Sequence, residues 1–284
     1  MKILVTGGAG FVGTNLIKRL VTEGHQITSI DNYSTGLRTN HIDGVRYLNE
    51  DISFCYRDWA VFDNFEIVYH LAAIARIQPS FKNPINYFKT NANGTMYIAE
   101  FCIRNNIPLV YAGSSSHHSG KFKNPYTFSK DVGEEIIQLY QEHFNLKSSI
   151  ARFYNVYGPH HLKSGGYCTL IGAWEKSIEN NQPLTIYGDG TKRRDFTHID
   201  DIVDGLVKIF EKNAWGHIFE LGRGINFSIK DIALMFNREF IFAEDKPGEA
   251  QVTLCENYLA KLILDWQPTK NISDYIKNYL NKRI

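Results

Sequence analysis

Residues 2–24 read KILVTGGAGFVGTNLIKRLVTEG, and this stretch decides the fold. KILVTG (2–7) is a short apolar run that ends at a glycine, which predicts a buried strand. FVGTNLIKRLVTEG (11–24) has apolar residues at helical spacing and predicts a helix. Three glycines lie at the junction of this strand and this helix: Gly7, Gly10 and Gly13. They permit a tight turn and let the backbone approach a phosphate. A strand, a glycine-rich turn and a helix in this order are typical of nucleotide-binding α/β proteins.

The same alternation continues through the first half of the chain. Apolar runs bounded by turn residues predict further strands at 26–31, 45–51, 66–73, 108–115 and 148–158. Helical spacing of apolar residues predicts helices at 86–106 and 126–144. Strands that alternate with helices form a parallel sheet with helices on both faces. We therefore expect an α/β protein with a Rossmann-type, doubly wound parallel sheet.

The pattern becomes irregular after Gly158, with shorter elements and more Gly, Pro and Asn. We expect residues 1–158 to form the Rossmann domain, which also receives 196–221. Residues 159–195 and 222–284 are expected to form a smaller C-terminal lobe. No long linker separates the two parts, so they should pack directly on each other.

Composition excludes several functional classes. The 284 residues include 31 basic and 30 acidic side chains, a net charge of +1, so no overall field draws the protein to nucleic acid or lipid. No apolar run reaches membrane-spanning length. The apolar run at the N-terminus is too short for a signal peptide. The four cysteines form no CxxC pair and have no His at ligand spacing, so no metal site is expected. We expect a soluble cytoplasmic protein.

Asp31 ends the second predicted strand, near the distance from the glycines at which an acidic residue binds the adenosine ribose. The alternative is an ordinary turn residue. A carboxylate at this position repels the 2′-phosphate of NADP, so Asp31 favours NAD as the cofactor.

Tyr126 and Lys130 lie four residues apart at the start of a predicted helix, on one face. A free phenol has a pKa near ~10, and a neighbouring ammonium together with the positive nicotinamide ring of NAD is expected to lower that pKa. Such a pair also occurs by chance on many helices. A serine cluster (114–116) ends the preceding strand, at the edge of a parallel sheet where ligands bind.

With these residues, the chain resembles the extended short-chain dehydrogenase/reductase family. The likeness is to its NAD-dependent epimerase/dehydratase branch, which acts on nucleotide sugars. It is carried by TGGAGFVG (6–13), DN (31–32), DI (51–52), HLAA (70–73), TNANGT (90–95), SSS (114–116), YTFSK (126–130), RFYNVYGP (152–159), IYGDGTKRRDFTHIDDIV (186–203) and KPGE (246–249).

The resemblance implies that the smaller lobe binds the nucleotide sugar, and it implies a role for individual residues. Those implied to contact NAD are Gly7, Gly10, Phe11, Val12, Gly13, Asp31, Asn32, Asp51, Ile52, Leu71, Ala72, Ala73, Asn91, Tyr126 and Lys130. Tyr126 is implied to be the acid/base, and Lys130 to hold the nicotinamide ribose. Asn155, Arg194 and Lys246 are implied to contact the substrate diphosphate, with Lys246 where the branch usually has an arginine.

The acting serine differs with the direction of counting. Counting forward from VYA indicates Ser114, whereas counting back from Gly120 indicates Ser115, which we prefer. Its hydroxyl would hydrogen-bond the reacting sugar oxygen beside the tyrosine.

The loop between the serines and the tyrosine departs from the family pattern. Only HHSGKFKN (117–124) is present, so roughly a dozen residues are missing by comparison. The loop holds none of the carboxylates that sugar dehydratases and decarboxylases of this branch carry there. His117 and His118 are either extra acid/base groups or solvent-facing loop residues.

These features favour a nucleotide-sugar 4-epimerase acting through a transient 4-keto intermediate on a UDP-hexose or UDP-N-acetylhexosamine. A 4-keto-sugar reductase, a 4,6-dehydratase and a non-catalytic NAD-binding regulator are the alternatives. By family analogy, the small Thr253 leaves room for a 2-acetamido group; alternatively it is a plain strand residue. The resemblance also implies a homodimer through helices 86–106 and 126–144.

Overall fold

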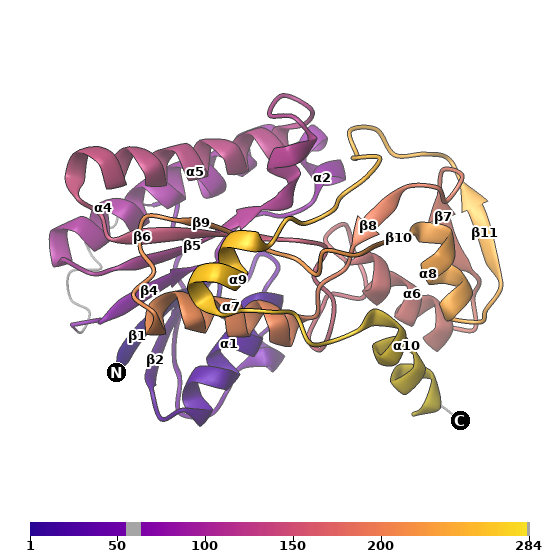
Figure 1. Ribbon diagram of the computed structural model, residues 1–284, viewed down its shortest axis with the longest axis horizontal. Helices are drawn as coiled ribbons and strands as arrows, with labels where there is room; N and C mark the ends of the chain where they lie inside the picture. The colour runs from indigo at the N-terminus through magenta and orange to yellow at the C-terminus, as the bar shows by residue number, and fades with distance from the viewer. Residues whose placement is uncertain (55–63, 283–284) are drawn as a thin grey trace.

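The computed structural model describes residues 1–54 and 64–282 (Figure 1). The stretch that opens the chain folds as its pattern predicts, into strand β1 (Lys2–Thr6) and helix α1 (Phe11–Thr22). Of the four cysteines, Cys55 lies outside the described residues, and the other three are free thiols.

A seven-stranded sheet, parallel throughout, forms the centre of the larger part. Its strand order is β3 (Arg46–Leu48), β2 (Gln26–Ile30), β1, β4 (Ile67–His70), β5 (Leu109–Ser114), β6 (Ser148–Phe153) and β9 (Ile218–Leu221). The chain starts at β1, builds outward to β3, and then returns to build β4 on the other side. Loops leaving β1 and β4 at their carboxyl ends therefore diverge, and ligands bind in the crevice that such a reversal creates. The prediction of a Rossmann-type doubly wound sheet is confirmed.

Helices cover both faces of this sheet (Figure 1). Helices α4 (Thr95–Asn105) and α5 (Pro125–Phe144) lie on one face, and their apolar side chains join a buried cluster that includes Leu4, Val68 and Tyr111. Helices α1, α7 (Ile199–Glu211) and α9 (Tyr258–Leu264) lie on the other face, around a second buried cluster. Apolar surface on both faces explains why the strands read as nearly continuous apolar runs.

The helix predicted at 86–106 is interrupted in the structure. Helix α3 (Pro84–Phe88) runs into a π-helical segment, η3 (Lys89–Gly94), before α4 begins. Single π-helical turns of this kind often occur at functional sites. Here the segment carries Asn91, whose side chain bonds the loop that follows β4.

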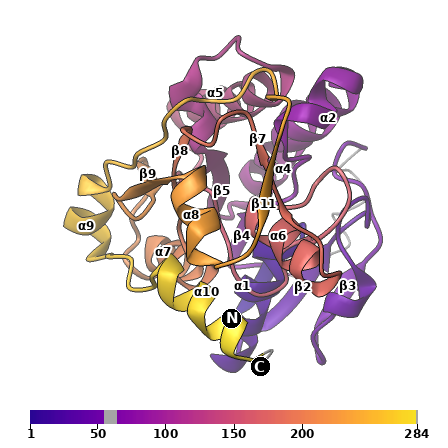
Figure 2. The same cartoon turned by 90° about the vertical axis from the view of Figure 1, so that its right-hand side faces the viewer.

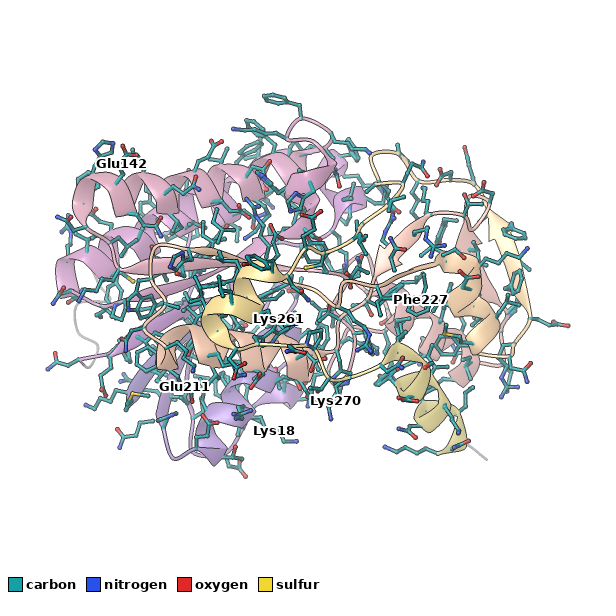
Figure 3. All side chains as sticks on the ribbon, viewed as in Figure 1. Lys18, Glu142, Glu211, Phe227, Lys261 and Lys270 are labelled. Atoms are coloured by element: carbon teal, nitrogen blue, oxygen red, sulfur yellow. The ribbon has the colours of Figure 1, made fainter. Side chains whose placement is uncertain are left out.

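The smaller part follows β6 and contains two short sheets (Figure 2). Strand β8 (Arg193–Asp195) pairs antiparallel with β10 (Asn226–Ser228), and β7 (Leu184–Tyr187) pairs parallel with β11 (Phe240–Ala243). Helices α6 (Leu170–Glu179), α8 (Ile229–Met235) and α10 (Ile272–Asn281) pack with them around a third apolar cluster. Figure 3 labels Phe227 in this part, far from Glu142 at the end of α5. The division of the chain into 1–158 with 196–221, and 159–195 with 222–284, stays a prediction.

In the described ranges, no helix is both long enough and apolar enough to span a lipid bilayer.

Candidate active site

A cavity of about 960 Å³ lies at the carboxyl edge of the large sheet and extends to the smaller part. Its walls come from the glycine-rich turn, the loop after β4, the end of β5, the start of α5 and the strands of the smaller part. Most residues singled out from the sequence line it: Gly7, Gly10, Phe11, Val12, Gly13, Asp31, Asn32, Ile52, Leu71, Ala72, Ala73, Ser114, Ser115, Tyr126, Asn155, Arg194, Lys246 and Thr253. Asp51, Asn91 and Lys130 do not line it and are described below.

The glycine-rich turn leaves no room for side chains at two of its positions. Gly7 has φ +73°, and a Cβ there would lie 2.8 Å from the backbone of Ala72. A Cβ on Gly13 would lie 2.2 Å from the carbonyl oxygen of Gly7. Gly10 precedes α1, whose first N–H groups point toward this end of the cavity, where anions are favoured. The turn therefore fits a diphosphate held by backbone groups.

Asp31 is positioned by two backbone donors at the end of β2. Its carboxylate accepts hydrogen bonds from the N–H groups of Ala9 at 2.9 Å and Tyr33 at 2.8 Å. Burial raises the pKa of Asp31, and these two donors oppose that rise. Asn32 donates to a carboxylate oxygen of Asp51 at 2.8 Å, so Asp51 contacts a residue of the cavity wall without lining the cavity itself. The adenine contact predicted for Asp51 and Ile52 stays a prediction.

Asn91 is buried and holds the loop after β4. Its amide nitrogen donates to the carbonyl of Ile74 at 3.0 Å and to the hydroxyl of Ser129 at 2.9 Å. Its oxygen accepts the N–H of Ile74 at 2.8 Å. Asn91 thereby joins this loop to α5, and it shapes the wall that includes Leu71, Ala72 and Ala73 without lining the cavity.

Tyr126 lies in the first turn of α5, and its hydroxyl is 3.2 Å from the Oγ of Ser114. Burial raises the pKa of Tyr126, while the Ser114 hydrogen bond and the positive charge of Arg76 lower it. The prediction that the ammonium of Lys130, together with the positive nicotinamide ring, lowers this pKa stays a prediction. The desolvation of the phenolate outweighs the favourable contacts, and Lys130 makes its hydrogen bonds elsewhere.

Lys130 is buried one helical turn after Tyr126. Its Nζ donates to the hydroxyl of Tyr111 at 2.6 Å and to the carbonyl of Ala112 at 2.7 Å. Burial lowers the pKa of Lys130 to about 8, although the carboxylates of Glu134 and Asp131 favour the charged form. Its predicted contact with the nicotinamide ribose stays a prediction.

The two candidate serines differ in their contacts. Ser114 Oγ is bonded to Tyr126 and also accepts the N–H of Ser116 at 3.2 Å. In the described part of the chain, the Ser115 hydroxyl has no protein hydrogen-bond partner, and it lines the same cavity. The serine hydroxyl that contacts Tyr126 therefore belongs to Ser114, while the preference for Ser115 as the acting serine stays a prediction. Which serine touches the sugar stays a prediction.

The shortened loop turns away from the cavity at its two histidines. His117 pairs with Asp131 at 3.0 Å, and His118 pairs with Glu220 at 2.9 Å. Both imidazoles are exposed, and neither lines the cavity. The geometry favours the reading of these histidines as loop residues.

The smaller part supplies the basic end of the cavity. Arg194 pairs with Glu249 at 3.3 Å, and burial lowers the pKa of Arg194. Lys246 lies over the ring of Tyr187, with Nζ 3.3 Å from the ring centroid. The side chain of Asn155 is held by the carbonyl of Asp195 at 2.9 Å. Cations grouped in this way can bind a diphosphate.

Sequence reasoning missed several charged residues that line the same cavity: Arg76, Lys192 and Glu249. Lys192 and Glu249 lie within or beside quoted motifs, KRRDF and KPGE, and that proximity was a usable signal. Arg76 follows the HLAA motif by three residues, and no spacing rule singled it out.

Comparison with known proteins matches residues 3–222 to the model of the NAD dependent epimerase/dehydratase family. The chain belongs to this family. It is 29% identical to the UDP-glucuronate 4-epimerase of Thermodesulfobacterium geofontis, over 98% of this chain and 94% of the relative. NAD is the cofactor, and the glycine-rich turn and Asp31 fit it, because the turn admits backbone-bound phosphates and Asp31 offers a carboxylate to the ribose.

Two solved structures of similar proteins span the whole chain. The UDP-glucuronic acid 4-epimerase from Bacillus cereus, solved with UDP-glucuronic acid and NAD, has a TM-score of 0.87 at 28% identity, with 100% of each chain covered. Pal from Bacillus thuringiensis has a TM-score of 0.93 at 27% identity, again with 100% of each chain covered. The fold is thus the same in this chain and in both solved structures.

Proposed function

We propose that this protein is an NAD-dependent nucleotide-sugar 4-epimerase that acts on a UDP-hexose or UDP-N-acetylhexosamine. The observation that carries the proposal is the pair formed by Tyr126 and Ser114, which lies in the cavity between the glycine-rich turn and the basic end. The named activities of the relatives given above support the same reaction type.

In this proposal Tyr126 is the general base that takes the proton of the sugar C4 hydroxyl. NAD, when bound, would supply the hydride acceptor and donor for C4. Loss of the proton and the hydride leaves a 4-keto sugar. After the sugar turns, Tyr126 would return the proton to the C4 oxygen. Arg194, Lys246 and Asn155 hold the diphosphate during this turn.

The residues around Tyr126 favour epimerisation over elimination. A 4,6-dehydratase needs a second acid and base to remove water, and the segment 115–124 contains no carboxylate. Epimerisation needs one base, one NAD and room for the intermediate to turn, and the cavity of about 960 Å³ offers that room.

The test is an assay of the purified protein with UDP-glucose, UDP-N-acetylglucosamine and UDP-glucuronate, without added cofactor. Conversion to the C4 epimer at constant total nucleotide sugar is the expected result. Dependence on added NADPH would instead identify a keto-sugar reductase. Binding of NAD without turnover of any substrate would identify a regulator and overturn the proposal.

We further propose that the protein is a cytoplasmic homodimer joined through α4 and α5. These helices expose apolar side chains, among them Met96, Leu139 and Phe144, which are 37%, 49% and 53% exposed. Light scattering coupled to gel filtration should give twice the 32.6 kDa chain mass, and Leu139→Glu should reduce it.

A further inference from the structure

Arg76 has no place in the roles assigned above, yet it lines the same cavity as Tyr126. It lies between the loop that follows β4 and helix α2 (Ile77–Lys82). Its Nε donates to the carbonyl of Tyr167 at 3.2 Å. Its positive charge acts on the phenol of Tyr126, which places the guanidinium on the reacting side of the cavity.

The backbone of Arg76 is held in an unfavourable conformation. Its φ is +110° and its ψ is 137°, a region that favours glycine. The hydroxyl of Tyr87 donates to the Arg76 carbonyl at 2.8 Å and secures this geometry. Strained residues of this kind persist where surrounding contacts impose them, and they gather at ligand sites. The strained backbone of Arg76 is therefore consistent with a ligand-binding role for its side chain.

The charges around Arg76 leave it without a carboxylate partner. The titratable groups that act on it are Tyr126, Cys168, Tyr87 and Glu249. Glu249 is the carboxylate among them, and it pairs with Arg194. Within residues 1–54 and 64–282, no carboxylate lies within ion-pair distance of Arg76.

The proposed diphosphate does not account for this cation either. Arg194 and Lys246 come from the smaller part and form the basic end of the cavity. Arg76 comes from the large sheet's side and acts on Tyr126, where the sugar C4 would lie. A second anionic group on the substrate, close to C4, is what this guanidinium can bind.

We propose that the sugar is a hexuronic acid, with its C5 carboxylate bound by Arg76. This inference rests on the proposed 4-epimerase reaction and changes its sugar from a neutral hexose to one that carries a carboxylate on C5. C5 is bonded directly to C4, so a carboxylate on C5 lies beside the atom that Tyr126 addresses. A planar guanidinium matches a carboxylate with two parallel hydrogen bonds, whereas a neutral hydroxymethyl group leaves a partly buried cation unpaired.

The first experiment compares UDP-glucuronate with UDP-glucose as substrates of the wild type, Arg76→Gln and Arg76→Lys. The wild type is expected to favour UDP-glucuronate in kcat/KM by about tenfold or more, the size of one charge-assisted interaction. Arg76→Gln should abolish this preference, and Arg76→Lys should retain part of it. Arg19→Gln, which removes a surface arginine paired with Glu23, is the control and should leave the preference unchanged. An equal loss on both sugars in Arg76→Gln would mean that Arg76 acts only on Tyr126, and would overturn the inference.

The second experiment measures binding without chemistry. In Tyr126→Phe protein loaded with NAD, calorimetry should show UDP-glucuronate binding at least about tenfold more tightly than UDP-glucose. Adding Arg76→Gln should remove the difference. Equal binding of the two sugars before Arg76 is changed would overturn the inference and leave the proposed epimerase intact. Selective binding by a protein that turns over no sugar would sustain the inference and overturn the epimerase.

Discussion

The side-chain amide of Asn155 donates to the hydroxyl of Thr253 at 3.1 Å. Thr253 also accepts the N–H of Asp195 at 3.1 Å, so one hydroxyl joins the loop after β6, strand β8 and the segment after KPGE. Asn155 itself has φ +31° and is held in the left-handed region. A hydrogen bond therefore joins Asn155, which is proposed to contact the diphosphate, to Thr253, which is proposed to limit sugar size.

Sugar size gives the first prediction. UDP-N-acetylhexosamines should be accepted at least as well as UDP-hexoses, and Thr253→Tyr should suppress the acetamido sugars selectively by filling the cavity. The measurement is the ratio of kcat/KM for UDP-N-acetylglucosamine and UDP-glucose.

Thr253→Val is the matched control, because it keeps the size and removes the hydroxyl that Asn155 contacts. Thr253→Val should weaken the binding of both UDP-sugars alike, because both use the diphosphate contact of Asn155. A Thr253→Tyr protein that keeps the original ratio would remove the basis for the size assignment.

Removal of the proposed base gives the second prediction. Tyr126→Phe deletes the ionisable oxygen and leaves the ring in place, so turnover should be lost while NAD remains bound. Steady-state rates and cofactor absorbance of the purified variant measure the two effects. A rate above a tenth of wild type, a loss below about 1.4 kcal/mol, is incompatible with a base role.

Cofactor choice gives the third prediction. Asp31→Ala should weaken NAD binding and improve binding of NADP, because a carboxylate that repels the 2′-phosphate is removed. Dissociation constants for both dinucleotides are the measurement. Asp31→Asn is the control, since it preserves the side-chain shape and should give the same change in preference. An unchanged preference would show that Asp31 does not contact the ribose.

The two serines give the fourth prediction. Ser114→Ala should move the pH–rate profile to higher pH, because the hydrogen bond between Ser114 and Tyr126 lowers the Tyr126 pKa. Ser115→Ala should reduce kcat more strongly and leave the position of the profile unchanged, because Ser115 lines the cavity and makes no hydrogen bond to Tyr126. Profiles of kcat against pH for both variants are needed. Two mild and equal losses would exclude both assignments.

A buried histidine gives the fifth prediction, on stability. His70 lies between the hydroxyls of Thr6 at 2.7 Å and Thr95 at 3.1 Å, and burial lowers the pKa of His70 to about 3. The unfolded chain binds a proton near pH 6.5, while the folded protein does not until about pH 3. The stability from this group is therefore present above pH 6.5 and is lost as the pH falls.

Urea unfolding at several pH values tests this. Between pH 6.5 and 5, the free energy of unfolding of the wild type should fall by about 1.5 kcal/mol more than that of His70→Gln. Parallel curves for the two proteins would show that His70 does not titrate with unfolding.

The sequence by itself determined the elements whose causes are local. The glycine-rich turn between β1 and α1, and the apolar runs that became β2, β4 and β5, depend on spacing and on the few conformations that glycine and apolar residues favour. Tyr126 and Lys130 were found for the same reason, because four residues along a helix place two side chains on one face. The predicted strands, turn and helices are present in the structure because tertiary packing favours the same conformations as the local sequence.

Only the tertiary structure decided which groups act on one another. Lys130 donates hydrogen bonds to Tyr111 and Ala112, while burial raises the pKa of Tyr126 and Ser114 and Arg76 lower it. Residues far apart in the chain come together when segments that follow separate strands pack side by side, as Asn155 after β6 and Thr253 after β11 do. The effects of burial and of neighbouring charges on a pKa depend on which groups lie within a few ångströms in space. Distance along the sequence does not determine them. For this reason the sequence did not predict that Arg76 lines the cavity and acts on Tyr126, and only the tertiary structure placed it there.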